Sequence, residues 1–389
     1  MRLYIFNPDT DLALANGKGN YTPTQKVRQM INDLALLPLW YAKSGSFVLV
    51  DQISDQDYLE EMNKLFKLGI KLLAVSELGS LQGSVEICPW GWNQSFRNML
   101  GRAGIDHNYL PDDAELEAHR QLSQRKVVGE LLHLFENVPD FCGFSLNLTN
   151  TKECDLFFNQ MRDRGGVVFK EPWSSSGKGL LWCRDELNMR DRNWCQRVIG
   201  DEGYVTAMPI YNKVQDFAME FFVGEAAVSF LGYSLFNTDH KGFYKGNALL
   251  GNEEIERCLT NYVPKVSLDR TLQMVEGFLA QKGYKGCVGV DMMICREAGE
   301  MRIHPCVEIN YRATMGYVAR VLKDNYLSDD AQGWFMIQHF RTHEELVCFV
   351  EENKVKAPLH IQQGRIHSGF LPLVPVLRST LNLAYIEVS

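Results

Sequence analysis

About the first 110 residues alternate short apolar runs with segments of helical spacing, and this alternation limits the fold more than any other feature of the sequence. Strands are expected at residues 3–6, 46–50, 71–75 and 84–88, and helices at residues 24–36, 56–68 and 94–102. Parallel strands need a long crossover connection, which is usually a helix. The alternation therefore predicts an open, mostly parallel α/β sheet that ends near the turn-rich residues 110–113.

The remaining residues mix strands and helices in an α+β pattern. A long amphipathic helix is expected at residues 114–135. Strands are expected at residues 167–170, 180–184, 202–210, 215–223, 225–233, 287–295 and 301–310, helices at residues 268–282 and 344–352, and a strand-rich tail after residue 358. The 389 residues exceed what one hydrophobic core usually supports, so more than one domain is expected.

Composition and charge exclude several classes of protein. The chain carries 40 Lys and Arg against 48 Asp and Glu, a net charge of −8, which argues against a nucleic-acid partner. It has no run of about 18 uncharged apolar residues, so no membrane span is expected. The first strand turns polar at Asn7, unlike a signal peptide. The ten cysteines occur without a Cys-x-x-Cys pair, which favours a reducing, cytoplasmic location over disulfides or a zinc site.

A phosphate-binding loop is predicted between the strands at residues 167–170 and 180–184. The first strand ends in Lys170, and a run of small residues with a second lysine follows: Ser174, Ser175, Ser176, Gly177, Lys178 and Gly179. Small residues let backbone N–H groups approach phosphate oxygens, and the two lysines add positive charge. A Walker A loop is excluded because Gly179 follows Lys178 where Ser or Thr would be needed. The alternative is an ordinary hairpin loop.

A metal site is predicted on the later strand pair. Alternation turns the apolar side chains of residues 288–294 one way and Asp291 the other, and it places Glu308, Asn310 and Arg312 on one face of the next strand. If the strands are neighbours, Asp291, Glu308 and Asn310 converge. Carboxylate and amide oxygens suit Mg²⁺ held together with nucleotide phosphates. Arg312 would then face a transferring phosphate or an oxyanion. The alternative is a solvated face of an edge hairpin.

Together these segments resemble the ATP-grasp superfamily, typified by D-alanine–D-alanine ligase, biotin carboxylase and glutathione synthetase. The resemblance covers about residues 119–325. It implies two α+β lobes that grip ATP, preceded by the open parallel α/β domain. The expected domains are residues 1–118 (α/β), 119–208 (small lobe), 209–330 (large lobe with the metal site) and 331–389 (an extension that packs on the large lobe).

The resemblance also assigns roles to individual residues. Lys170 resembles the lysine that reaches the α-phosphate and the adenine side, and the Ser/Gly loop resembles the flap that closes over the β- and γ-phosphates. Asp291, Glu308 and Asn310 resemble the metal ligands, for two Mg²⁺ ions with Mn²⁺ as an alternative. Arg312 resembles the arginine that stabilises the acyl-phosphate step.

Other positions are assigned less directly by the same resemblance. The adenine hinge would lie near Met208, although many members carry Glu there. Asp216 or Glu220 would be the acidic residue on the ribose side. Arg125 or Lys126 would be a further phosphate-side cation, or else part of a solvated helix face. In the polar loop at residues 237–247, Lys241 or Lys245 would hold phosphate near the substrate, or else the loop is plain surface.

Two loops that follow strands of the first domain are also of interest, because ligands of open α/β sheets bind beyond the carboxyl ends of strands. Residues 7–11, followed by the polar residues 16–22, are a candidate substrate wall. Residues 89–93, with two tryptophans, either line a pocket mouth or pack between domains.

The expected function is that of an ATP-dependent carboxylate–amine ligase. Such an enzyme activates a small-molecule carboxylate as an acyl phosphate, which an amine or thiol attacks with release of ADP and phosphate. An amino acid or peptide is the commonest substrate by family analogy. The alternatives are a phosphotransferase with the same fold and a nucleotide-binding regulator that is not an enzyme. Pathway and oligomeric state do not follow from the sequence.

Overall fold

The computed structural model describes residues 1–53, 56–81, 85–173, 179–238 and 244–389. The predicted site residues Ser174, Ser175, Ser176, Gly177, Lys178 and Lys241 lie outside this described part. Contacts within the chain divide it into two compact units. Unit 1 comprises Met1–His119, Lys245–Asn252 and Arg312–Ser389, and unit 2 comprises Arg120–Tyr244 and Glu253–Tyr311.

Unit 1 begins with the parallel sheet that the sequence predicts. Its strands are β1 (Arg2–Ile5), β2 (Phe47–Val50), β3 (Lys71–Ala74) and β4 (Glu86–Pro89), in the order β3-β2-β1-β4. All three pairings are parallel. The helices are α1 (Thr10–Asn16), α2 (Gln25–Asp33), α3 (Gln56–Phe66) and α4 (Gln94–Arg102). Apolar strand residues such as Leu3, Leu49 and Ile87 pack with Leu100 of α4 in one core, so burial of the strand faces holds this layer together.

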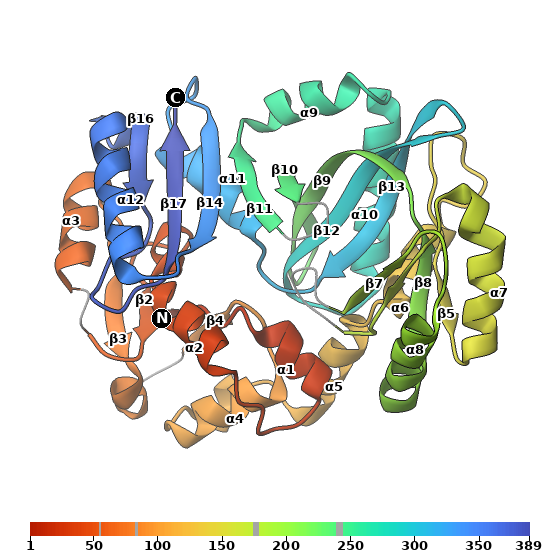
Figure 1. Cartoon of the computed structure of the whole chain (residues 1–389). Coiled ribbons are helices and arrows are strands. Elements are labelled where there is room, and N and C mark those ends of the chain that lie inside the picture. The colour runs from red at the N-terminus through yellow and green to blue at the C-terminus, as the bar shows by residue number, and fades with distance from the viewer. Residues whose placement is uncertain (54–55, 82–84, 174–178, 239–243) are drawn as a thin grey trace. The chain divides into compact units, whose positions relative to one another are not determined.

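Unit 1 also contains an antiparallel sheet made mainly from the end of the chain. Its strands β11 (Tyr244–Leu249), β14 (Gly333–His339), β17 (Asn382–Val388), β16 (Arg365–Pro372) and β15 (His360–Gln362) lie in this order. The accompanying helices are α11 (Met315–Tyr326) and α12 (His343–Lys356), and α12 lies against β16 (Figure 1). The buried carboxylate of Asp33, at the end of α2, accepts hydrogen bonds from Leu381 N at 3.0 Å and from Asn382 N and Nδ2 at 2.9 and 2.8 Å. These bonds fix β17 to the α/β layer.

Unit 2 contains two sheets. The first has the order β5-β8-β6-β7, with β5 (Leu146–Leu148), β8 (Val205–Pro209), β6 (Val167–Lys170) and β7 (Leu180–Cys183), and all its pairs are antiparallel. Helices α7 (Thr151–Met161) and α8 (Met189–Glu202) pack on this sheet. Phe157 of α7, Phe169 of β6 and Val198 of α8 are buried in its core. Strand β6 lies between β8 and β7, and Lys170 is its last residue.

The second sheet of unit 2 runs β13-β12-β9-β10, with β13 (Glu300–Asn310), β12 (Gly286–Glu297), β9 (Asn212–Val223) and β10 (Val228–Thr238). These strands are long and antiparallel. Helix α10 (Lys265–Ala280) packs on β9 and β10 (Figure 1), and α9 (Asn252–Thr260) precedes it in the chain. The hairpin of β12 and β13 carries the predicted metal ligands.

The expected single helix at residues 114–135 is wrong, because it is divided into α5 (Asp113–Leu122) and α6 (Lys126–His133). The break has a tertiary cause. The backbone N–H of Arg125 donates to Pro172 O at 2.9 Å, so its donor serves a segment far along the chain. The strand expected at residues 202–210 begins only at Val205, because α8 continues to Glu202 and ends at Gly203 in the left-handed region, with φ 88°.

The four-part domain division stays a prediction, and it differs from the two units, since Arg312–Ser389 group with the N-terminal residues. Within the described ranges, every helix is too short or too polar to cross a membrane.

Candidate active site

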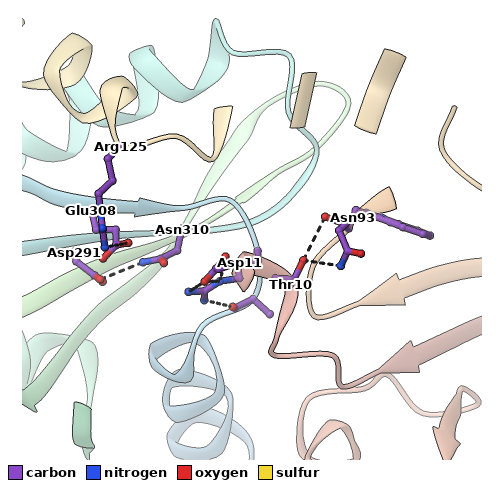
Figure 2. Close-up of polar contacts among 10 residues, drawn as sticks. Thr10, Asp11, Asn93, Arg125, Asp291, Glu308 and Asn310 are labelled. Atoms are coloured by element: carbon purple, nitrogen blue, oxygen red, sulfur yellow. Dashed lines mark hydrogen bonds and ion pairs between the residues drawn. The ribbon is translucent and has the colours of Figure 1, made fainter. Parts of the chain in front are cut away.

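Three oxygen-bearing side chains meet on the β12–β13 hairpin of unit 2. Asp291 lies directly opposite Glu308, and Gly289 lies opposite Asn310. The Asn310 Nδ2 donates to Asp291 Oδ2 at 3.1 Å, as Figure 2 shows. The convergence expected from strand alternation is therefore confirmed, whereas the role of these residues as metal ligands stays a prediction.

On this hairpin, side chains alternate between the two faces as far as Asp291, and the strand register then shifts. Val288, Val290, Met292 and Ile294 are buried, and Asp291 between them is only half-buried. The pairing then shifts, because the next pair after Asp291 and Glu308 is Met293 with His304. This irregularity contains Pro305, and proline in a sheet is typical of bulges because it cannot donate to the ladder.

His304 lies beyond the bulge and serves the core. Its side chain is fully buried, and its ring packs edge-on against Tyr211 with 5.0 Å between the ring centroids. Burial lowers the pKa of His304 to about 3, so the imidazole is neutral at pH 7. His304 is therefore a packed core histidine rather than a partner of Glu308.

Two buried cations lie beside the carboxylates. Lys170, at the end of β6, is 6% exposed, and its Nζ donates to Val307 O at 3.2 Å. Burial, and then the nearby Arg125 charge, lower the pKa of Lys170 to about 8. Arg125 places Nη2 at 3.2 Å from Glu308 Oε1 and Nη1 at 3.0 Å from Glu171 O. Figure 2 shows Arg125 directed at Glu308. Cations held out of water beside a cavity favour an anionic ligand.

A cavity of about 660 Å³ lies between the two sheets of unit 2. Its charged wall includes Lys170, Arg125, Asp291 and Glu308. The rest of the wall is largely apolar: Val168, Leu180, Trp182, Met208, Pro209, Ile210, Tyr211, Phe236, Met292, Met293 and Val307. A concave pocket that combines apolar side chains with charged groups is typical of a small-molecule site.

The structure separates two pairs of alternatives left open by the sequence. Asp216 lines the cavity and accepts a hydrogen bond from Thr238 Oγ1 at 2.8 Å, whereas Glu220 is 2% exposed and is not part of the lining. Arg125 lines the cavity, whereas Lys126 does not and instead contacts Gln121. The geometry therefore favours Asp216 and Arg125 for the predicted roles.

Other sites predicted from the sequence are placed as follows. Met208 contributes its apolar side to the cavity and pairs with Val168 in the sheet. Gly179 has φ 62°, and its carbonyl oxygen accepts a hydrogen bond from Glu171 N at 2.9 Å. Lys245 is exposed on β11. Its contact with phosphate, like that of Lys241, stays a prediction.

Arg312 belongs to unit 1, where it pairs with Asp11. Its Nε lies 3.0 and 2.9 Å from the two carboxylate oxygens, and Nη2 lies 2.7 Å from Oδ2. A bidentate pair of this kind fixes the plane of the guanidinium. The sequence analysis singled out residues 7–11 but did not predict that Asp11 pairs with Arg312. The one available signal was that Asp11 follows the carboxyl end of β1, where ligands of open α/β sheets bind.

The loops after β1 and β4 are joined by buried polar contacts in unit 1. Asn7 Nδ2 donates to Gly91 O at 2.7 Å. Asn93 Nδ2 donates to Thr10 Oγ1 at 3.2 Å (Figure 2), and Thr10 Oγ1 donates to Trp92 O at 3.3 Å. The strand order reverses between β1 and β4, and these hydrogen bonds join the loops that follow the two strands. Both loops therefore stabilise the structure by satisfying buried polar groups.

Sequence reasoning also missed charged residues around the cavity. Arg164, Arg184 and Lys213 contribute to its lining. Lys213 Nζ contacts Asp216 Oδ2 and donates to Thr238 Oγ1 at 2.7 Å. The available signal in the sequence was that Lys213 lies three residues before Asp216 on a predicted strand.

The residues present fit a metal–nucleotide ligand better than a metal alone. In the described residues no cluster of three or more His, Cys, Asp and Glu side chains is arranged to hold a metal ion. Asp291 and Glu308 with the Asn310 amide oxygen offer fewer than the six ligands that Mg²⁺ requires. Phosphate oxygens and water would complete the shell, which matches the buried cations beside it.

Neither the protein-family models nor the curated proteins give a match to this sequence. The fold, in contrast, is shared with solved structures. The N5-carboxyaminoimidazole synthetase of Staphylococcus aureus, complexed with ADP, is 11% identical with a TM-score of 0.50, and the match covers 98% of this chain and 92% of that one. The biotin carboxylase of Campylobacter jejuni, in a β-γ-ATP complex, is 10% identical with a TM-score of 0.53 over 100% and 87% of the two chains.

A third structure is the biotin carboxylase domain of the 2-oxoglutarate carboxylase of Hydrogenobacter thermophilus, in complex with MgADP, ADP and bicarbonate. It is 11% identical with a TM-score of 0.51, and the match covers 100% of this chain and 86% of that one. All three have the ATP-grasp fold. At these identities the likeness establishes the fold, so the expected ATP-grasp fold with a parallel N-terminal sheet is confirmed.

Proposed function

We propose that this protein is an ATP-dependent ligase that activates a substrate carboxylate as an acyl phosphate for attack by an amine or thiol. One observation carries the proposal. Within an ATP-grasp fold, Asp291 and Glu308 face each other across two strands, and a single cavity is lined by both carboxylates and by the buried Lys170. Opposite charges that share a cavity in this way suit a metal-bound polyphosphate.

The cavity has separate surfaces for the parts of ATP. Its apolar wall, including Met208 and Tyr211, would hold the base, and Asp216 would meet the ribose. Lys170 and Arg125 would bind phosphate oxygens, and the Ser/Gly loop would close over them. The ADP, β-γ-ATP and MgADP complexes of the neighbouring folds support this assignment.

Mg²⁺, as two ions with Mn²⁺ as an alternative, would be held by Asp291, Glu308 and Asn310 together with the phosphates. When bound, the metal neutralises phosphate charge and polarises the γ-phosphoryl group. The protein orients the two carboxylates through the pairing of β12 with β13. The hydrogen bond from Asn310 Nδ2 to Asp291 Oδ2, at 3.1 Å, also fixes the Asp291 side chain. Lys170, shielded from water, adds a charge that need not reorganise during the reaction.

The proposed reaction has two steps. A carboxylate oxygen of the substrate attacks the γ-phosphorus, the bond from that phosphorus to the β–γ bridging oxygen breaks, and ADP leaves. The amine or thiol then attacks the acyl carbon and loses a proton, and the carbon–oxygen bond to phosphate breaks. Arg312 would stabilise the charge that develops at the acyl group, and Lys241 or Lys245 would contact phosphate.

The substrates are proposed to be small molecules, with an amino acid or peptide as the carboxylate. One neighbouring structure holds bicarbonate, which is a carboxylate-like acceptor of phosphate. The cytoplasmic location stays a prediction that rests on ten cysteines without a Cys-x-x-Cys pair.

Hydroxylamine trapping tests this function. The protein is incubated with ATP, Mg²⁺ and a panel of carboxylates, with hydroxylamine as the nucleophile. We expect a hydroxamate with at least one acid, together with release of phosphate, and neither product with Glu308→Ala. A phosphorylated product without hydroxamate would identify the phosphotransferase alternative, and ATP binding without turnover across the panel would identify the regulator.

A further inference from the structure

We propose that Arg125 is a positioning residue that occupies Glu308 when no nucleotide is bound and gives it up to the metal when phosphate arrives. This inference rests on the proposed function, because it concerns the same cavity. It goes beyond that function because it predicts that nucleotide and metal bind cooperatively through the Arg125 side chain. The contacts of Arg125, all inside unit 2, carry it.

Arg125 contacts two segments of unit 2. Its backbone N–H donates to Pro172 O at 2.9 Å and Nη1 donates to Glu171 O at 3.0 Å, so it is held by the segment that leads into the Ser/Gly loop. Its Nη2 reaches Glu308 Oε1 at 3.2 Å. The side chain is 5% exposed, whereas that of Glu308 is 31% exposed. Because Arg125 is anchored through its backbone, the contact with Glu308 is the one that can exchange.

A cation at hydrogen-bond distance from Glu308 competes with a divalent ion for the same oxygen. Mg²⁺ binds by direct contact with carboxylate oxygens, and Arg125 both takes up one of them and repels the incoming charge. In the form described here, Asp291 and Glu308 therefore bind a metal less tightly than two unpaired carboxylates would.

A polyphosphate reverses this balance. Arg125 lies close enough to Lys170 to lower the pKa of that ammonium, so two buried cations face the same space. In the described part of the chain, the Nε of Arg125 is buried and makes no hydrogen bond. The planar guanidinium can offer Nε and Nη2 together to a phosphate, which is a geometry that guanidinium groups favour. Phosphate would thus attract Arg125 and free Glu308.

The consequence is a coupling between the two ligands. Nucleotide should raise the affinity for metal, and by linkage metal should raise the affinity for nucleotide by the same factor. Removing Arg125 should abolish this coupling while making the metal site stronger by itself. A residue with a purely structural role would not produce a gain in metal affinity.

The test is a titration of the full chain with Mn²⁺ alone, followed by electron paramagnetic resonance of the free ion, without nucleotide. We expect Arg125→Gln to bind Mn²⁺ more tightly than the wild type by about fivefold or more, the lower end of typical couplings between sites. Arg197→Gln is the matched control. It removes a charge that contacts Glu171 Oε1 at 3.1 Å, and it should leave Mn²⁺ affinity unchanged.

A double-mutant cycle identifies the oxygen involved. On a Glu308→Gln background, Arg125→Gln should give a clearly smaller gain in Mn²⁺ affinity, because only the relief of charge repulsion remains. Unchanged or weaker Mn²⁺ binding by Arg125→Gln, or an equal gain without Glu308, would overturn the proposal. If Arg125→Gln does not fold, as judged by circular dichroism, Arg125→Lys replaces it, since lysine lacks the two separate nitrogens with which Arg125 contacts Glu171 O and Glu308. A smaller gain is then expected, and no gain again overturns the proposal.

This outcome is separate from that of the hydroxylamine experiment, because Mn²⁺ binding without nucleotide involves no turnover. If a hydroxamate forms but Arg125→Gln shows no gain in Mn²⁺ affinity, the ligase function is supported and the Arg125 exchange is rejected. If Arg125→Gln gains Mn²⁺ affinity but no hydroxamate forms, the exchange is supported and the ligase function is rejected.

Discussion

Replacing Lys170 with Met should make the protein more stable and a poorer binder of ATP. The reason is the buried charge. The pKa of Lys170 falls from 10.5 to about 8, first through burial and then through the Arg125 charge. This gap corresponds to roughly 3 kcal/mol by which the folded protein disfavours the charged ammonium.

The sign of the pH dependence follows from the direction of this shift. Between about pH 8 and 10.5 the unfolded chain keeps the Lys170 proton and the folded chain has lost it. The unfolded state then binds more protons, so the free energy of unfolding rises with pH across this window. Below about pH 8 both states are protonated, and the full penalty of about 3 kcal/mol is present.

Methionine has a similar length and removes this penalty. It also loses the bond from Nζ to Val307 O, which is worth about 1 kcal/mol. The net expectation at pH 7 is a gain of about 2 kcal/mol in the free energy of unfolding. ATP affinity should fall by about 30-fold or more, since removing one partner of a desolvated charge pair costs about 2 kcal/mol or more.

Urea unfolding at pH 7 and pH 9.5, with calorimetry of ATP binding, measures both effects. The rise in wild-type stability between these pH values should be absent in Lys170→Met, and wild-type ATP affinity should fall as the pH passes about 8. Lys285→Met is the matched control, because Lys285 is 63% exposed and contacts Glu225. A destabilised Lys170→Met protein, or one that binds ATP as well as the wild type, would refute the reasoning.

Two further outcomes are expected. Glu308→Ala should abolish Mg²⁺-dependent turnover and lower the melting temperature by a few degrees without unfolding the protein, because the buried Arg125 loses the partner of its charge; full activity would remove Glu308 from the metal site. Asp33→Ala should lower the free energy of unfolding by about 3 kcal/mol in urea, because it leaves the donors of Leu381 and Asn382 without their buried acceptor; a change below about 1 kcal/mol would mean that these donors find water instead.

The features that could be predicted from the sequence are those governed by local periodicity. Strand alternation fixed which side of residues 288–294 is buried, and this gave the approach of Asp291 to Glu308 before any pairing was known. The parallel sheet followed in the same way, because strand and helix patterns alternate along the chain. Each of these inferences uses neighbours a few residues apart, where side-chain direction is set by the backbone.

The features that could not be predicted depend on residues distant in the sequence. Nothing local indicates that the helix at residues 114–135 breaks, since the cause is the bond from Arg125 to Pro172. Likewise, Arg312 was expected to face phosphate, and its partner Asp11 lies at the other end of the chain. A pattern can show that a charge lies on one face of a strand, but it cannot show which opposite charge reaches it.

The same distinction explains how a fold can be shared at 10–11% identity when no family model matches the sequence. A core accepts many combinations of apolar residues if volume and periodicity are kept, so most positions drift. A site that binds a charged ligand accepts few side chains, because an unpaired buried charge is costly. The approach of Asp291 to Glu308 could therefore be predicted from spacing and chemistry, whereas an apolar position such as Met208 carries no comparable signal. If this reasoning holds, the residues most resistant to substitution in unit 2 are Lys170, Arg125, Asp291 and Glu308, and the apolar wall of the cavity tolerates exchange.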